Sequence, residues 1–327
     1  MRQTSAAPPV LPIVQTMARH LEAFRHHHST ALEETGETAE AIHKVRVTTR
    51  RLQADLDLLQ CGPNSAVVRD LKQRLRDFRN SLSTIRNYDV FIGIIEAELQ
   101  RAEDADLADL ALLARRLHEE RDQAAAEARK ILGRFKLKRI VSMLGESNPD
   151  EKTKKHRLEF RGLDEARLKR RAARRLEARL ADFLGLVTRL RDTSDTDGIH
   201  QLRIAAKRLR YLIETLTDLG FRAPKGALRW LRAEQGKIGD WHDLFCLEEE
   251  VLGLVGKREA RHGKLDESAA LLRATAKLLK AREMKASRTF PVKPPNYFER
   301  SVGRLARDVF PRNSAENDER GKPRKNS

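Results

Sequence analysis

Apolar residues recur at intervals of three and four along most of the chain. Met17, Leu21 and Phe24 follow this spacing near the start, and Leu176 and Leu180 follow it in the second half. Such spacing places side chains on one face of an α-helix. No stretch alternates apolar and polar residues as a half-buried strand would. The pattern therefore predicts an all-α protein.

The same pattern, with its Gly and Pro breaks, predicts the order of the helices. They are expected over about 12–34, 38–61, 66–82, 90–102, 107–144 (one bent helix or two), 164–191, 195–219, a short helix through Leu228 and Leu231, another through Leu247 and Leu254, 265–285, and a short one over 302–309. Turns are expected at 86–90 and 238–243. The segment 148–162, which contains Pro149 and the basic run 152–157, is the predicted linker.

One stretch of sequence occurs twice. Residues 42–52 and 199–209 both read Ile-His-x-aliphatic-Arg-aliphatic-x-x-basic-Arg-Leu. Around each copy the order is helix, motif helix, helix, turn, helix, and the repeat distance is roughly half the chain. The sequence therefore predicts a tandem duplication of a helical bundle.

Each motif helix carries a row of cations opposite its apolar face. The row reads His43, Arg46 and Arg50 in the first copy, and His200, Arg203, Lys207 and Tyr211 in the second. Like charges one turn apart repel by a few tenths of a kcal/mol per pair. Helix packing gives no reason to build such a row twice, whereas an anionic ligand does.

The overall charge agrees with this interpretation. The chain of 327 residues has a net charge of +17 and an isoelectric point near 10.2. These values predict a polyanionic partner, namely nucleic acid, an anionic membrane or inorganic polyphosphate. The alternative is a basic surface that only confers solubility. Patterned charge favours a partner.

Other sequence features argue against several classes of protein. Cys61 and Cys246 form no CxxC pair, which suits a reducing compartment, and no run reaches the length of a membrane helix. We therefore expect a cytoplasmic protein. His242-Asp243 resembles part of a metal-dependent phosphohydrolase motif, but further converging ligands are not evident, and no Gly-rich phosphate loop or nucleophile elbow occurs. We expect neither a metal, nor a cofactor, nor catalysis.

The doubled motif resembles the CHAD family, whose name stands for conserved histidine α-helical domain. The resemblance covers about residues 12–287 and implies two four-helix bundles related by a pseudo-twofold axis, with a basic groove between them that binds inorganic polyphosphate. It also implies association with polyphosphate granules. The predicted bundles span about 12–147 and 163–287, and 288–327 is expected to be a mostly disordered, charged tail.

The resemblance transfers the binding role to specific positions. The predicted polyphosphate contacts are His43, Arg46, Arg50, Arg51, Arg86, His200, Arg203, Lys207, Arg208, Arg210 and Tyr211. Arg86 resembles the family's arginine in the turn after the third helix. Asn87 and Ser83 replace the aspartate and glycine usual around that turn. Asp57 and Glu214 are expected to orient Arg50 and either Lys207 or Arg210.

Some alternatives remain open at this level. Many family members carry an N-terminal triphosphate-tunnel domain with a Glu-x-Glu-x-Lys strand, and no such motif occurs here, so a stand-alone member is expected. Nucleic acid is the main alternative ligand, although few aromatic residues are available for base stacking. The histidines either meet phosphate or bond across the bundles, and the arginines of 167–179 either extend the site or form a solvated face.

Overall fold

The structure is a computed structural model that describes residues 12–33, 38–60, 64–144, 164–190, 195–262 and 265–311. Within these ranges the chain forms eleven α-helices and no strand. They are α1 (Pro12–Leu32), α2 (Thr38–Leu59), α3 (Asn64–Ser81), α4 (Ser83–Leu99), α5 (Asp104–Arg134), α6 (Leu137–Leu144), α7 (Glu165–Arg189), α8 (Thr196–Asp218), α9 (Lys225–His262), α10 (Leu265–Thr289) and α11 (Tyr297–Val309). The all-α prediction is confirmed.

Several helix ends are set by local sequence. Asp195 caps α8 by accepting a 2.7 Å hydrogen bond from the Gly198 amide, as an N-cap side chain should. Gly220, with a φ of 95°, ends the same helix, and the Phe221 amide donates to the Leu216 carbonyl. A glycine in the left-handed region with this back-bond is a Schellman end. The second motif helix is therefore bounded by its own sequence.

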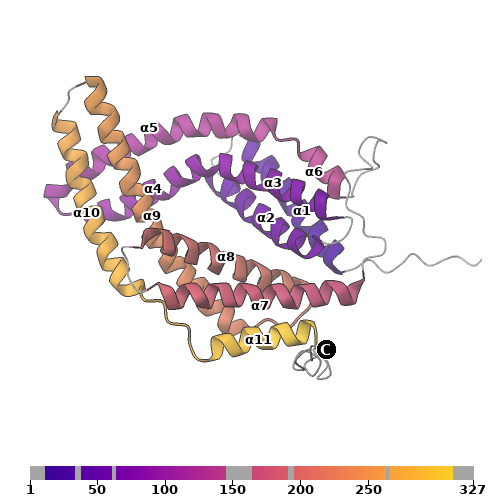
Figure 1. The fold of residues 1–327 in the computed structure, drawn as a ribbon. Coiled ribbons are helices and arrows are strands. Elements are labelled where there is room, and N and C mark those ends of the chain that lie inside the picture. The colour runs from indigo at the N-terminus through magenta and orange to yellow at the C-terminus, as the bar shows by residue number, and fades with distance from the viewer. Residues whose placement is uncertain are drawn as a thin grey trace, which may run out of the picture.

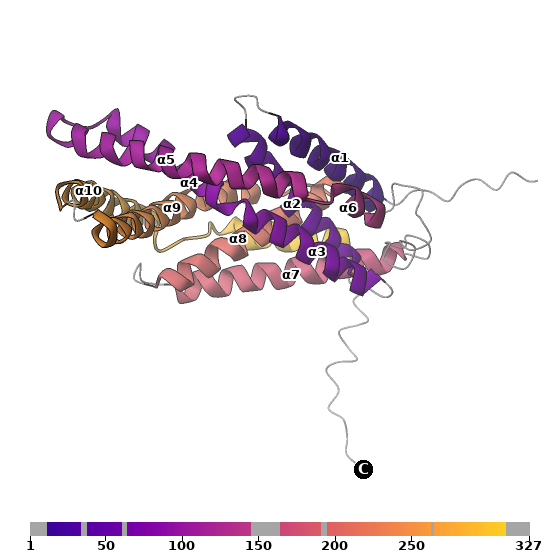
Figure 2. The same ribbon diagram turned by 90° about the horizontal axis from the view of Figure 1, so that it is seen from above.

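The helices of each half pack mainly on one another. α1, α2, α3 and α5 contact one another in the first half, and α7 packs with α8 and α11 in the second. Figure 1 shows these two groups on opposite sides of the molecule, with α2 and α8 facing each other between them. Figure 2, seen from above, shows α5 running along α4 and α10 lying beside α9.

The buried residues form two cores, and each core contains residues from before and from after the predicted linker. The larger core joins α1, α2 and α3 to α7, α8 and α11, with Phe24, Phe183 and Phe298 fully buried. A smaller core at one end of the molecule joins α4 and α5 to α9 and α10 through residues such as Ile95 and Leu247. We call this end of the molecule the distal arm. The predicted linker at 148–162 lies outside the described residues.

Two predicted turns are absent from the described chain. α9 continues through 238–243, because Ile238, Trp241, Leu244 and Leu247 are buried at helical spacing. Each buried apolar side chain contributes roughly 1.5–3 kcal/mol, which outweighs the cost of about 1 kcal/mol for a glycine inside a helix. The other predicted turn, 86–90, also lies within a helix, so Arg86 is inside α4 rather than in a turn.

The short helix expected over 302–309 is present and begins earlier than predicted, at Tyr297. This helix, α11, packs against α7 and α9 with Phe298, Val302 and Leu305 buried. Residues 297–309 are therefore helical within a segment that was expected to be mostly disordered. Residues 312–327 lie outside the described chain.

Candidate anion-binding site

The two motif helices lie side by side. α2 contacts α8 directly, and each buries the apolar face that the sequence predicts. Val45 and Leu52 of α2 are completely buried, as are Leu202 and Leu209 of α8. This packing leaves Arg46, Arg50, Arg203 and Lys207 half-buried at the boundary between the two helix groups, whereas His200 is exposed.

Arg50 of α2 and Lys207 of α8 occupy equivalent positions in the two motifs and lie within range of each other's charge. Burial, followed by the charges of Arg203 and Arg50, lowers the pKa of the Lys207 amine to about 6. Asp243 partly opposes this shift. Lys207 is therefore largely neutral at pH 7 and would regain its proton beside an anion.

Arg46 is fixed at the corner between α3 and α4. Its guanidinium donates hydrogen bonds of 2.5 Å to the Arg79 carbonyl and 3.2 Å to the Ser83 hydroxyl. Burial and the charges of Arg50 and Arg79 lower the pKa of Arg46 to about 9. A guanidinium remains charged at neutral pH, so Arg46 is a half-buried cation with other cations around it. Ser83, which replaces the family's usual glycine, thus gives Arg46 a partner.

Arg79 belongs to the same group, although sequence analysis did not single it out. Burial and the charge of Arg50 lower the pKa of Arg79 to about 10, and its guanidinium donates to the Gln53 amide oxygen. Burial also lowers the pKa of Arg203, where Arg50 adds to the shift and Asp243 opposes it. Arg50 is the shared neighbour. We call Arg46, Arg50, Arg79, Arg203 and Lys207 the central cation cluster.

Arg86 and His43 lie at the first-half edge of this cluster. The charge of Arg86 contributes to the lowered pKa values of both His43 and Arg46. For His43 the largest cause is burial, and Arg86 comes next. His43 is therefore neutral at pH 7 and can donate one ring N–H.

The other edge of the cluster contains a chain of hydrogen-bonding groups. His200 Nδ1 lies 3.1 Å from His242 Nε2, and His242 Nδ1 lies 3.0 Å from Cys246 Sγ. Burial raises the pKa of the Cys246 thiol to about 11, so the thiol keeps its proton. His242 bridges Cys246 and His200, and the histidine tautomers decide which groups donate. Arg203 sits beside this chain, 3.3 Å from Asp243.

Arg210 and Tyr211 contact each other at the side of the cluster. The Arg210 guanidinium lies 4.7 Å from the centre of the Tyr211 ring, a cation–π contact. Arg210 contributes to the lowered pKa of Lys207, and Tyr211 has a smaller, opposite influence on Arg79. Both predicted residues therefore border the cluster. Tyr211 is buried and Arg210 half-buried.

Arg51 and Arg208 do not join the central cation cluster. Arg51 is exposed on α2, and none of the contacts given for the described residues includes its side chain. Arg208 is also exposed, and the charges that act on it come from Arg179, Asp57 and Arg76. Adjacent helix positions point about 100° apart, so a position beside Arg50 or Lys207 cannot share its direction.

The prediction that Asp57 orients Arg50 is wrong. Its carboxylate contacts Lys72, Arg175 and Arg179 instead. The helical wheel placed Asp57 near the cationic row but could not show that α7 lies closer. Glu214, its counterpart in the repeat, contacts Arg210 at 4.0 Å, in agreement with the prediction, and Arg232 at 2.8 Å.

The chemistry available at the cluster is that of an anion-binding site. Four guanidiniums and one amine converge, whereas Asp243 is the carboxylate that acts on them. Guanidiniums bind phosphate oxygens through paired N–H donors. Within the described chain, no three His, Cys, Asp or Glu side chains are grouped as metal ligands.

Comparison with known proteins identifies the family. The CHAD domain model matches residues 15–252, about three-quarters of the chain. The chain belongs to the CHAD family. The CHAD domain begins three residues after the predicted boundary at 12, and the matched region ends inside α9, before the predicted boundary at 287.

Solved structures show the same CHAD fold. The crystal structure of the CHAD domain from the plant Ricinus communis matches with a TM-score of 0.61 and 20% identity, covering 92% of this chain and 96% of that one. PptA from Streptomyces chartreusis matches with a TM-score of 0.56 and 16% identity, covering 85% and 98%. A comparison with curated proteins found no significant match. No described helix is long and apolar enough to cross a membrane.

Proposed function

We propose that this CHAD protein binds inorganic polyphosphate without catalysis, through the central cation cluster. The observation that carries the proposal is the position of Arg50, which lies within range of every other cation in the cluster, from both repeated motifs. Four guanidiniums lie together here, and burial with the charges of Arg203 and Arg50 lowers the Lys207 pKa to about 6, so the cluster is unfavourable unless an anion occupies it.

Linear polyphosphate suits this arrangement. Each unit of the chain carries negative oxygens, and the chain has no bases that require stacking or edge recognition. Arg46, Arg50 and Arg203 come from two different helices and present several guanidinium groups in succession. A repeated anion can satisfy such donors at any register, and the CHAD family resemblance favours the same ligand.

The lack of catalytic chemistry in the proposal rests on the groups that surround the cluster. His43 is neutral and crowded by arginines, and Cys246 holds its proton through a raised pKa. Asp243 is paired with Arg203. These groups can bind and orient phosphates, and we propose an adaptor role, associated with polyphosphate granules in the cytoplasm.

Nucleic acid is the second candidate, because the net charge of +17 attracts any polyanion. It is less favoured because the cluster offers little surface for base stacking. Tyr211, the aromatic residue at its edge, is buried and already contacts Arg210.

A competition experiment at fixed physiological salt tests the proposal. Labelled long-chain polyphosphate is bound to the full chain and challenged with single-stranded or duplex nucleic acid at equal phosphate concentration. We expect polyphosphate to remain bound. Displacement at equal charge would support a general anion surface, and absence of polyphosphate binding would refute the proposal. Free phosphate release, measured in the same samples, should stay at background.

A further inference from the structure

A second group of cations surrounds Asp57, on the side of α2 that faces α7. Arg175 and Arg179 approach the Asp57 carboxylate at 3.4 and 3.8 Å, and Lys72 of α3 contacts it as well. Arg171 donates a 3.3 Å hydrogen bond to the Asp57 backbone carbonyl. Helices from both halves of the chain thus contribute to one site.

The positive charge at this site exceeds what Asp57 can neutralise. Arg208 of α8 lies in the field of Arg179 and Asp57, and Arg76 of α3 acts on it too. Asp182 is the other nearby carboxylate, and it sits 4.0 Å from Arg179, at the limit of an ion pair. Several cations therefore share two carboxylates.

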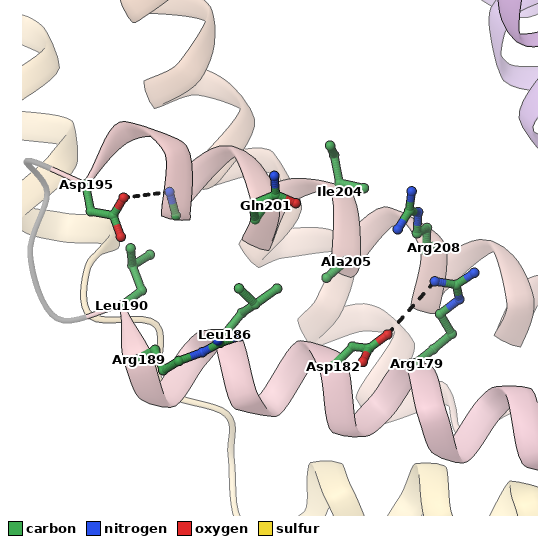
Figure 3. A pocket seen from close by; sticks show the side chains of 11 residues that line it. Arg179, Asp182, Leu186, Arg189, Leu190, Asp195, Gln201, Ile204, Ala205 and Arg208 are labelled. Carbon is green, nitrogen blue, oxygen red and sulfur yellow. Dashed lines mark hydrogen bonds and ion pairs between the residues drawn. The ribbon is translucent and has the colours of Figure 1, made fainter.

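A pocket opens from this group along the gap between α7 and α8. Its volume is about 510 Å³, and Arg179, Arg189 and Arg208 are the cations that line it. Figure 3 shows Arg179 of α7 and Arg208 of α8 at one end of the pocket, with Arg189 and Asp195 toward the other. A pocket of this volume has room for more than a single ion, and Arg179 and Arg208 line one end of it.

Arg76 connects the pocket with the central cation cluster. Its charge contributes to the lowered pKa of Arg79, a member of that cluster, and also to that of Arg208. The charge of Arg76 therefore reaches both groups of cations, and α3, which carries it, lies against α2.

The corresponding surface in the first half lacks this charge. Buried residues of α1 (13, 17, 21 and 24) and of α7 (172, 176, 180 and 183) have the same spacing. In this alignment Thr16 and His20 stand where α7 has Arg175 and Arg179. His20 is buried against Asp55 at 2.6 Å. The arginines of α7 are therefore not required by the packing of this helix position.

We propose that Arg175, Arg179 and Arg208, with the pocket beside them, form a second anion-binding surface that receives the part of a polyphosphate chain extending beyond the central cation cluster. We call it the α7 arginine surface. The proposal rests on the proposed function and adds a distinction between chain lengths. A short chain occupies the central cluster alone, whereas a long chain contacts both sites.

The test compares R175Q/R179Q with the wild-type chain, using tripolyphosphate and a long-chain polyphosphate as ligands. We expect long-chain affinity to fall about tenfold, since two partly exposed phosphate contacts are lost, while tripolyphosphate affinity is unchanged. The salt dependence of long-chain binding should also weaken by about 0.7 per lost contact. R167Q/R174Q, which removes two exposed arginines from the same helix, is the matched control and should bind both ligands as the wild type does.

D57N provides an independent test that does not depend on the folding of the double variant. Removing the carboxylate frees Arg175 and Arg179, so long-chain affinity should rise about threefold and tripolyphosphate affinity should not change. An equal effect on both ligands, or none relative to the control, would overturn the second surface while leaving the central site intact. Failure of the wild-type chain to bind either ligand would instead refute the proposed function.

Discussion

The central cation cluster and the distal arm use the same types of residue in opposite ways. In the distal arm, ion pairs between cations and carboxylates link neighbouring helices. They are Arg116 with Glu267, Arg121 with Asp89, Arg273 with Asp109, Lys277 with Asp106, and Arg282 with Glu248. In the central cluster four arginines and Lys207 lie together, and Asp243 acts on Arg203 and Lys207.

This difference shows that unpaired charge is not a general property of the chain. Carboxylates are abundant, with 48 Asp and Glu residues against 65 Lys and Arg, and the distal arm pairs them across α5, α9 and α10. Ion pairs on a surface contribute about 0–1 kcal/mol each, so pairing alone does not explain the fold. The crowding of cations between α2 and α8 instead indicates a site that an external anion completes.

The strongest test of the comparison removes two cations from each region. R50A/K207A should weaken polyphosphate binding roughly hundredfold, because each charged hydrogen bond contributes about 1.5–3 kcal/mol. Its melting temperature should be unchanged or higher, since like charges are removed. R273A/K277A removes one arginine and one lysine from the distal arm instead and should bind normally. Unfolding of R50A/K207A would mean that the cationic rows are structural.

Single substitutions of arginine should change the free energy of unfolding in the distal arm but not in the central cation cluster. R121A leaves the Asp89 carboxylate, whose side chain is 8% exposed, without its cation. The free energy of unfolding should fall by about 1–3 kcal/mol, the cost of an unsatisfied buried group. R50A should cause no such loss. Urea denaturation of both variants measures the difference, and equal destabilisation would remove the contrast.

The pH dependence of binding should come from Lys207. Its pKa in the free protein is about 6, and an anion raises it, so binding takes up a proton above pH 6. Affinity should therefore increase as the pH falls from about 8 toward 6 and then level, by at most tenfold per pH unit. K207R remains charged throughout and should lose most of this dependence. Titration calorimetry in buffers of different ionisation enthalpy measures the proton directly.

The smallest expected effect belongs to Asp243. D243N removes the carboxylate 3.3 Å from Arg203, and polyphosphate affinity should rise about threefold because a partly exposed ion pair no longer competes. E248Q, which removes a carboxylate from the distal arm, is the control and should leave affinity unchanged. A decrease in D243N would show that Asp243 orients Arg203 rather than competing with the ligand.

Much of the fold follows from local sequence. The apolar spacing of α2 and α8 and the cap at Asp195 with the stop at Gly220 bound these helices correctly. The turns expected at 86–90 and 238–243 are helical instead, because buried apolar residues such as Tyr88 and Trp241 continue the helix through both segments. α11 was underestimated because its charged residues obscured five buried apolar positions.

The site was predicted unevenly for a related reason. Arg46, Arg50, Arg203 and Lys207 follow from the helical wheel, because each motif helix has one polar face. Arg79 and the partners of Asp57 depend on how α3 and α7 lie against α2, which no spacing within one helix reports. Arg208 was predicted to bind together with the other motif residues, but the neighbouring charge that affects it most is that of Arg179 on α7.

The sequence by itself determined that this protein is helical, basic and built around two copies of one cationic motif, because periodicity and charge are local properties of a chain. Only the tertiary structure decided that the charge of Arg50 acts on Lys207 and that Asp57 forms an ion pair with Arg175. It also decided that the charge of Arg76 acts on Arg208. These contacts depend on packing between helices that are far apart in sequence. Differences of a few ångströms in that packing decide whether two charged side chains repel each other, form an ion pair or bind a ligand.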